Sequence, residues 1–207
     1  MANKTRGRPA GQGGQAPVLA NDEIRRVMRL ARARQRHGIR AEVALSLSFY
    51  LGLRAKEIAS LKWNDVYDGN GEVKSVLTLY AAYTKGSKTR SSFLTSPQLR
   101  SCLTRYGKDS SLNFWKSAET ALLQSQQGGH LRPASIVRML KQLFIEVGLP
   151  HASSHTGRRT FITSLAERGI DLKAIAMLAG HSNIRTTALY VDASPQKLSR
   201  ILAEVAW

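Results

Sequence analysis

The sequence has little of three things: cysteine, acidic side chains and long apolar runs. Its 207 residues include one cysteine, Cys102, which excludes an internal disulfide and a cysteine-rich zinc site. No apolar run approaches the roughly 18 residues of a membrane-spanning helix, and the Lys- and Arg-bearing start lacks the apolar middle of a secretion signal. We therefore expect a cytoplasmic protein with no membrane partner.

The shortage of acids predicts a polyanionic partner. Thirty-one Lys and Arg residues stand against fourteen Asp and Glu residues, for a formal net charge of +17. A surface of this charge gains affinity by releasing condensed counterions from phosphates, which favours nucleic acid. With 43% hydrophobic residues, the chain can bury one sizeable core, so a single domain with tails is expected.

The first eighteen residues differ in composition from the rest. Residues 1–18 are rich in Gly, Gln, Ala and Pro, carry Lys4, Arg6 and Arg8 without an acid, and show no apolar period, which predicts a disordered basic tail. The run Arg6-Gly7-Arg8-Pro9 is similar to the core of an AT-hook, whose arginines lie along the minor groove of A·T-rich DNA. A generic basic tail is an equal alternative. Both interpretations place Arg6 and Arg8 on DNA.

Residues 19–207 are predicted to form one mainly α-helical α+β domain with a small antiparallel sheet. Helical spacing or capping signals predict helices from Asn21, over Ala41 to Leu53 with Gly52 near the end, over Leu53 to Trp63, from Ser96 to about Tyr106, from Pro133 to Val147, from Ser153, from Asp171, and over about 195–207. The run Ala41 to Leu53 is apolar nearly all round and reads as a central buried helix.

Cations gather at two further places. The first helix carries arginines opposite its apolar face, and the charge of the whole chain favours a nearby phosphate backbone over a merely solvated face; of these we assign Arg25, Arg29 and Arg32 to DNA. The second place is a predicted hairpin, in which Val76 to Tyr83 and Thr89 to Leu94 flank Lys85-Gly86-Ser87-Lys88. Its tip presents Lys85, Lys88 and Arg90, although a solvated tip is the usual meaning of such lysines.

Three short patterns place polar groups one turn apart or around a glycine. Arg54 and Glu57 share a helix face, so the carboxylate can hold a guanidinium that still has donors for a phosphate. His155 and Arg158 lie in the first turn of a helix, where the free N–H groups also favour an anion. The third is Leu178-Ala179-Gly180-His181, followed nine positions after the histidine by Tyr190. Taken singly, each pattern has an ordinary explanation as an ion pair or a packed helix end.

Taken in order, these patterns closely resemble the catalytic domain of the tyrosine recombinase, or phage integrase, family, from about Leu19 to Trp207. The resemblance implies that Arg54 and Arg158 clamp the scissile phosphate, with Glu57 in support. It further implies that His181 hydrogen-bonds the phosphate and that Tyr190 is the nucleophile. Lys85 would protonate the leaving oxygen, with Lys88 on the same hairpin as the alternative, and His155 would act as an acid or base. Arg159 is expected on DNA.

The chemistry suits these residue types. Two guanidiniums can hold the charge that develops on the non-bridging oxygens of a phosphodiester, so no metal or other cofactor is implied. Tyrosine, with an ordinary pKa of about 10, becomes a nucleophile when its proton is removed or cations stabilise its phenolate. The family attacks phosphorus to give a 3′-phosphotyrosyl link and a free 5′-hydroxyl, which can later reverse the step without ATP.

The sequence departs from the family pattern at several positions. Many relatives have Leu-Arg-His where this chain has Gly157-Arg158-Arg159, and Leu-Gly-His where it has Ala179-Gly180-His181. Typical members carry a separate DNA-gripping helical domain ahead of the catalytic region, whereas only about twenty residues precede that region in this sequence. We therefore expect a small single-domain member whose basic tail replaces part of that grip.

The resemblance predicts a site-specific recombinase that integrates, excises or inverts DNA, as in mobile elements. It would act on double-stranded recombination sites as a tetramer joined through its C-terminal segment, in the nucleoid of the cytoplasm. A DNA-binding regulator that keeps the fold and a type IB topoisomerase-like relaxase are the alternatives.

Overall fold

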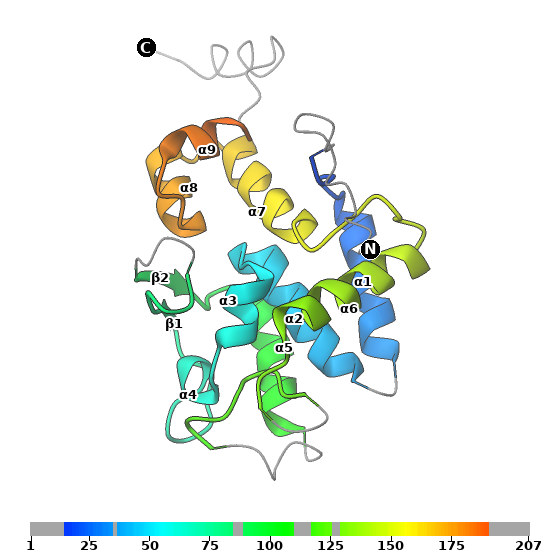
Figure 1. The fold of residues 1–207 in the computed structure, drawn as a ribbon, viewed down its shortest axis with the longest axis vertical. Coiled ribbons are helices and arrows are strands. Elements are labelled where there is room, and N and C mark those ends of the chain that lie inside the picture. The colour runs from blue at the N-terminus through cyan, green and yellow to red at the C-terminus, as the bar shows by residue number, and fades with distance from the viewer. Residues whose placement is uncertain (1–14, 35–36, 85–88, 110–116, 126–128, 191–207) are drawn as a thin grey trace, which may run out of the picture.

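The described part of the chain is mainly helical, with one small antiparallel sheet at its edge, and the mainly α-helical α+β class is as predicted (Figure 1). The computed structural model describes residues 15–34, 37–84, 89–109, 117–125 and 129–190. The predicted tip residues Lys85 and Lys88, the tail arginines Arg6 and Arg8, and the predicted helix 195–207 lie outside the described residues. None of the helices within the described ranges has the length and apolar character needed to cross a bilayer.

The helices and strands follow one another in chain order. They are α1 (Asn21–Ala33), α2 (Gly38–Leu51), α3 (Ala55–Ser60), α4 (Trp63–Val66), β1 (Val76–Leu79), β2 (Arg90–Phe93), α5 (Pro97–Lys108), α6 (Pro133–Glu146), α7 (Thr156–Glu167), α8 (Leu172–Ala179) and α9 (Ile184–Ala188).

Helix α2 is the central element, as its sequence predicts. Nearly every one of its side chains from Ala41 to Leu51 is buried, and α1, α5, α6 and α7 all pack against it. A helix that is apolar on all sides must be surrounded by other elements to remove that surface from water. Gly52 ends it in the left-handed conformation, with φ of 63°, where a β-carbon would also collide with the ring of Phe161.

The predicted helix over Leu53 to Trp63 is two helices. Helix α3 stops at Ser60, and α4 begins at Trp63. The break follows from capping: the Asp65 carboxylate accepts a hydrogen bond from the backbone N–H of Lys62 at 2.8 Å, which starts a new helix there. The side chain of Glu57 does the same for the backbone N–H of Arg54, also at 2.8 Å, and so fixes the first turn of α3.

The predicted hairpin is present, but its first strand is shorter than its sequence indicates. Strands β1 and β2 pair antiparallel, with Val76 opposite Phe93 and Leu79 opposite Arg90. The expected extension to Tyr83 is wrong, because the chain turns after Leu79: the N–H of Tyr83 donates to the Tyr80 carbonyl at 2.9 Å. Arg90 stands at the end of the pairing, where its side chain reaches Leu178 in α8 and Glu57 in α3. Figure 1 shows the sheet beside these helices.

Helices α7, α8 and α9 lie together above the main core in Figure 1 and enclose a small core of their own, built on Ile162, Ala166, Ile175 and Ala179. Gly157 permits the close crossing of α7 over α2, because a β-carbon there would lie 2.3 Å from the Oγ of Ser48. A glycine that weakens an isolated helix is therefore required by packing. The junction of the two cores is where the predicted site residues meet.

Candidate active site

A buried carboxylate organises the first half of the site. Glu57 is fully buried, and its Oε1 accepts from the Nη1 of Arg54 at 3.0 Å. Its Oε2 accepts from the Nη2 of Arg90 at 2.9 Å. One negative charge thus holds two guanidiniums, which offsets the cost of removing all three groups from water. The Arg54 side chain keeps 23% of its surface exposed, so donors remain available to a ligand.

Arg158 is fixed by the carbonyl ends of two helices. Its Nη1 donates to the carbonyl of Gly52, which follows α2, at 2.7 Å, and its Nη2 donates to the carbonyl of Ala179 in α8 at 2.6 Å. Each of these nitrogens carries a second hydrogen, so two donors remain for a phosphate. Burial, and then the charge of Arg54, lower the pKa of Arg158 to about 9, which still leaves the guanidinium charged at neutral pH.

His181 is held in the neutral form. Burial first, and then the positive charges of Arg158 and Arg54, lower its pKa from 6.5 to about 4. Its Nδ1 lies 2.8 Å from the Oγ1 of Thr187, a fully buried side chain of α9. With the threonine hydroxyl donating to Nδ1, the Nε2–H becomes a hydrogen-bond donor for a phosphate oxygen.

Tyr190 lies against the same histidine. The two rings are stacked, with centroids 6.1 Å apart and an interplanar angle of 21°. On another side, the guanidinium carbon of Arg159 lies 6.0 Å from the centre of the tyrosine ring. A charge on Tyr190 raises the pKa of Arg158, so the phenol is within electrostatic reach of that guanidinium. The nucleophile predicted from the sequence is therefore beside two of the predicted phosphate ligands.

His155 is placed at the edge of this group. It precedes α7 directly, one turn before Arg158, and is exposed. Its backbone N–H donates to the Oγ of Ser153 at 3.3 Å, which fixes the turn that leads into the helix. An exposed imidazole at this position can exchange protons with a ligand and with water.

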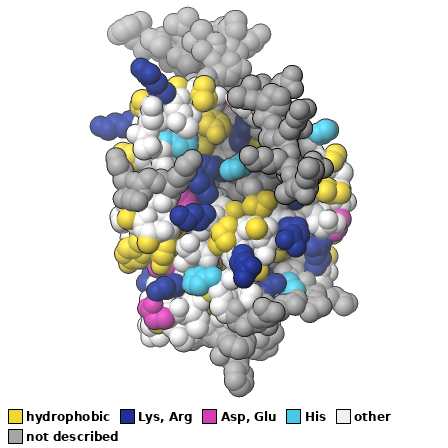
Figure 2. All heavy atoms as spheres, in the orientation of Figure 1, with side chains coloured by type: hydrophobic (Ala, Val, Ile, Leu, Met, Phe, Trp, Pro, Cys, Tyr) yellow, Lys and Arg dark blue, Asp and Glu magenta, His cyan; other side chains and the backbone are white. Residues whose placement is uncertain are grey.

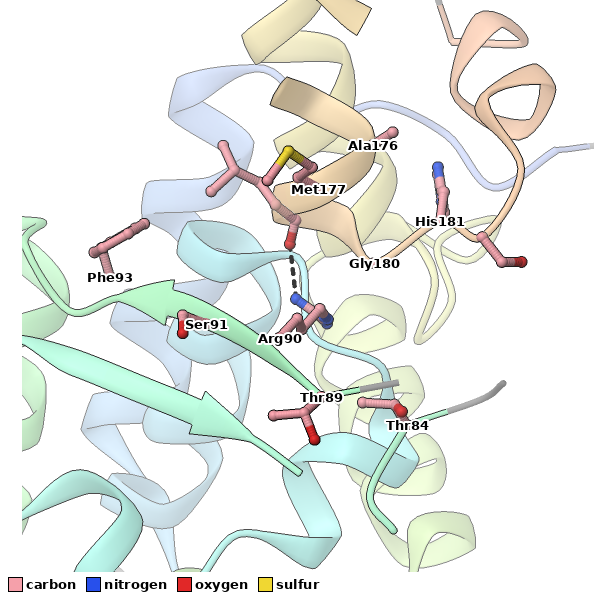
Figure 3. A pocket seen from close by; sticks show the side chains of 11 residues that line it. Thr84, Thr89, Arg90, Ser91, Phe93, Ala176, Met177, Gly180 and His181 are labelled. Atoms are coloured by element: carbon pink, nitrogen blue, oxygen red, sulfur yellow. Dashed lines mark hydrogen bonds between the residues drawn. The ribbon is translucent and has the colours of Figure 1, made fainter. Parts of the chain in front are cut away.

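Arg90 differs from its predicted place on the DNA surface. Only 10% of its side chain is exposed, and besides Glu57 it binds the carbonyl of Leu178 through Nη1 at 2.7 Å. Figure 3 shows it reaching from β2 under the end of α8, with this hydrogen bond dashed. Its Nε lies 2.4 Å from the place where a β-carbon of Gly180 would be, so only glycine fits there. This geometry favours a positioning role, which sequence spacing alone does not reveal.

A groove of 470 Å³ runs alongside this contact, between β2 and the end of α8 (Figure 3). Phe93 and Met177 line it and are strongly exposed, at 51% and 67% of their surfaces. His181 and Gly180 line it as well, so the groove adjoins the predicted site.

The arginines of α1 include one, Arg32, that forms an ion pair and is still largely exposed. Arg32 binds the buried carboxylate of Glu42 at 2.7 Å yet keeps 61% of its side chain exposed. Arg25 and Arg29 line a groove with it between α1 and α2. Their assignment to DNA stays a prediction. In Figure 2, Lys, Arg and His side chains gather across the visible face, whereas acidic side chains are few and mostly peripheral.

Arg54 after α2 and Arg158 in α7 therefore converge with His181 and Tyr190, which flank α9. Two charged guanidiniums, a neutral imidazole and a phenol form a set that can bind a phosphodiester and attack it. Sequence reasoning found each of these but missed Thr187 and the two helix-end carbonyls. The left-handed glycines at 52 and 180 were the available signal, because they mark helix ends, where the last carbonyls have no partner within the helix.

Comparison with known proteins gives consistent matches. The model of the phage integrase family matches residues 17–197. The chain is 28% identical to tyrosine recombinase XerD of Rickettsia prowazekii over 191 residues, covering 89% of this chain and 61% of that protein. It is 30% identical to the XerD of Oceanobacillus iheyensis, covering 87% and 59%. The chain thus spans about three fifths of the length of these relatives.

Solved structures share the fold. XerA recombinase superposes with a TM-score of 0.67 at 24% identity, covering 93% of this chain and 68% of that one. XerH recombinase bound to palindromic difH substrate superposes with a TM-score of 0.71 at 20% identity, covering 95% and 55%. The extent of the family match, together with the ordered site residues, shows that the chain belongs to the phage integrase family.

Proposed function

We propose that this chain is a site-specific DNA recombinase that cuts and rejoins strands through a 3′-phosphotyrosyl intermediate. The observation that carries the proposal is the convergence of Arg54, Arg158, His181 and Tyr190, with Glu57 holding Arg54 in place. The relatives it matches are tyrosine recombinases, and solved structures of its fold include XerH recombinase bound to difH substrate and the Tn1549 transposon integrase in complex with a circular intermediate DNA.

In the proposed step, the hydroxyl oxygen of Tyr190 attacks phosphorus and the bond to the 5′ oxygen breaks. Arg54 and Arg158 hold the non-bridging oxygens as their charge increases, and the Nε2–H of His181 donates to one of them. Lys85, or its neighbour Lys88, gives a proton to the leaving 5′ oxygen, and His155 accepts or returns the tyrosine proton. A 5′-hydroxyl from a second strand then attacks the phosphotyrosine and releases Tyr190.

The proposed partner is double-stranded DNA at specific sites, bound by a tetramer on the bacterial nucleoid. The tetramer would be joined through the segment that follows Tyr190, which links one subunit to the next. Arg25 and Arg29 would add DNA contacts, and Arg6 and Arg8 would tether the tail. Integration, excision and inversion all follow from the same two transfers.

The test first needs a DNA site. A pool of randomised duplexes is selected for binding to Tyr190→Phe, which lacks the nucleophilic oxygen but keeps the ring. Selected duplexes are then nicked, labelled and incubated with the wild-type protein, Tyr190→Phe and Tyr80→Phe. Tyr80 is a matched control because its ring is half exposed on the hairpin side.

We expect a denaturant-resistant protein–DNA adduct with the wild type and with Tyr80→Phe, and none with Tyr190→Phe. Peptide mapping should place the nucleotide on Tyr190. Tight binding without an adduct would favour a DNA-binding regulator that keeps the fold. Relaxation of supercoiled plasmids of any sequence, without exchange of strands between duplexes, would favour a type IB topoisomerase-like enzyme.

A further inference from the structure

Arg159 lies between the N-terminal segment and the tyrosine. Its Nη1 donates to the carbonyl of Ala16 at 2.8 Å, and its guanidinium carbon stands 6.0 Å from the centre of the Tyr190 ring. Its Nε is buried and has no acceptor among the described residues. The guanidinium therefore contacts both the Ala16 carbonyl and the Tyr190 ring, which are 174 positions apart in the sequence.

The segment that holds Arg159 is itself anchored. We call residues 15–19 the strap. Besides the Ala16 contact, the strap is held where the backbone N–H of Leu19 donates to the Oγ1 of Thr160 at 3.1 Å. The Leu19 side chain is only 6% exposed and belongs to the main core. The strap thus contacts two successive residues of α7 and joins that helix to the main core.

Tyr190, in contrast, has few contacts that fix it among the described residues. It follows α9, a helix of five residues, and its neighbour Leu189 is 70% exposed. Its backbone N–H bonds to the Thr187 carbonyl at 3.0 Å, but this bond does not orient the ring. The described groups on the ring include His181 by stacking, Arg159 by its cation and the small core around Ile162.

We propose that Arg159 is a positioning residue for Tyr190: the strap fixes the guanidinium, and the guanidinium fixes the ring. The proposal rests on the proposed function, since it concerns the nucleophile of that reaction. Arg158 and Arg159 are successive residues of one helix and project about 100° apart, so Arg159 does not simply repeat the role of Arg158. The same link lets the position of the N-terminal segment act on the tyrosine.

The competing interpretation makes Arg159 a phosphate ligand, and kinetics separate the two. Arg159→Met and Arg159→Lys are compared with Arg168→Met, which removes an exposed guanidinium from the end of the same helix. With a selected, nicked duplex, the adduct-forming rate is measured at saturating DNA, and the dissociation constant is measured across salt concentrations.

If Arg159 positions the tyrosine, Arg159→Met lowers the adduct-forming rate at saturating DNA by about three- to thirtyfold, because the contact between a cation and an aromatic ring contributes on that scale. The DNA affinity and its salt slope stay unchanged. Arg159→Lys recovers part of the rate, since it keeps a cation but lacks the planar fork. Arg168→Met changes nothing. An unchanged saturated rate with a salt slope reduced by about 0.9 would instead identify a phosphate contact and overturn the proposal.

The strap is tested in the full chain by Pro17→Gly, which frees its backbone while leaving its charge alone. We expect the saturated rate to fall about two- to fivefold, the scale on which glycine releases a fixed backbone. The double variant Pro17→Gly with Arg159→Met should have the same saturated rate as Arg159→Met, because both changes interrupt the same series of contacts from the strap through Arg159 to Tyr190. Additive losses would show that the strap acts elsewhere.

A spectroscopic measurement keeps the proposal testable without catalysis. The protein is labelled with 3-fluorotyrosine, and the fluorine resonance of Tyr190 is assigned from its loss in Tyr190→Phe. Arg159→Met and Pro17→Gly should shift that resonance, and Arg168→Met should not. A resonance that stays in place in Arg159→Met would overturn the proposal. Absence of any adduct with the wild type would count against the proposed function alone, since the fluorine shift is independent of it.

Discussion

At several positions near the site, contacts with single atoms leave room only for glycine. At Gly180, a β-carbon would lie 2.4 Å from the Nε of Arg90, and the left-handed φ of 65° also disfavours any other residue. At Gly52, a β-carbon would lie 2.6 Å from the ring of Phe161. Each glycine adjoins a carbonyl that orients Arg158 or Arg90. The glycines therefore set how closely the arginines approach the helix ends.

Gly157 gives the sharpest test at this scale. Alanine normally stabilises a helix by about 1 kcal/mol relative to glycine. Here its β-carbon would lie 2.3 Å from the Ser48 Oγ and 3.1 Å from the Ser48 carbonyl carbon, so α7 must move away from α2. We expect Gly157→Ala to lower the free energy of unfolding in urea by about 1–3 kcal/mol, the usual cost of overpacking.

Two further variants act as controls for Gly157→Ala. Ser48→Ala removes the nearest atom of the clash, a hydroxyl that is buried without a partner among the described residues, so the double variant should recover part of the loss. Gly69→Ala adds a β-carbon that meets nothing within 4 Å and should change stability by less than about 0.5 kcal/mol. Stabilisation by Gly157→Ala would contradict the close crossing.

At the scale of elements, the sheet is joined to the site by one side chain. Arg90 is the last residue of the β1–β2 pairing and binds Glu57 in α3 as well as Leu178 in α8. It therefore ties three elements together, and its burial makes the ties costly to break. The hairpin loop that carries Lys85 directly precedes β2 in the sequence.

We expect Arg90→Met to loosen these elements while leaving DNA affinity nearly unchanged. Loss of the guanidinium leaves Glu57 with Arg54 alone and should destabilise the fold by about 2 kcal/mol or more. Amide exchange should rise in β2 and at the end of α8, and the adduct-forming rate should fall. Lys173→Met, on the exposed side of α8, is the control. If Arg90→Met instead weakens DNA affinity, reduces its salt slope and leaves amide exchange unchanged, Arg90 is a DNA contact and not a positioning residue.

Helices that are specified by local sequence signals could be predicted, whereas element boundaries that depend on contacts with distant residues could not. Helices α2, α6 and α8 follow from a continuous apolar run, a proline start and an aspartate cap, and the end of α2 near Gly52 was predicted correctly. The break between α3 and α4 was missed because helical spacing continues through Leu61. A new helix begins at Trp63 because the Asp65 side chain caps it and because the backbone N–H of Trp63 donates to the carbonyl of the distant Thr120.

The same division applies to the site. Residue types and order identified Arg54, His155, Arg158, His181 and Tyr190 as candidates, because phosphate chemistry requires those groups. The role of Arg90 depends on Glu57 and Leu178, 33 and 88 positions away, and no local pattern encodes such pairings. Gly157 had no explanation in the sequence because its reason, Ser48, lies on another helix.

At the scale of the whole molecule, the site occupies the junction between two cores. Among the described residues, the smaller core has four buried side chains, so α7 and α8 depend on links to other parts of the chain. The bond from Arg158 to Gly52 is one link, and the strap is another. If Arg54 and Arg158 hold a phosphate as proposed, the phosphate adds a further link, and the junction should tighten when DNA is present.

The excess of positive charge extends beyond this junction into the tail, where Lys4, Arg6 and Arg8 lie outside the described residues. If the tail tethers the protein to DNA, replacing all three by glutamine in the full chain removes up to three phosphate contacts. The slope of log affinity against log salt should then fall by as much as about 2.7. The strap stays intact in this variant, so the saturated adduct-forming rate should remain that of the wild type.

Sequence composition of the DNA separates the two interpretations of the tail. An AT-hook predicts a larger affinity loss on A·T-rich flanks than on G·C-rich flanks, because its arginines follow the narrow minor groove. A generic basic tail predicts equal losses. The control replaces Lys108, Arg168 and Lys173 by glutamine, which removes the same charge from exposed positions of the folded domain. A slope that falls equally in both triple variants would show that total charge, and not the tail, determines the tethering.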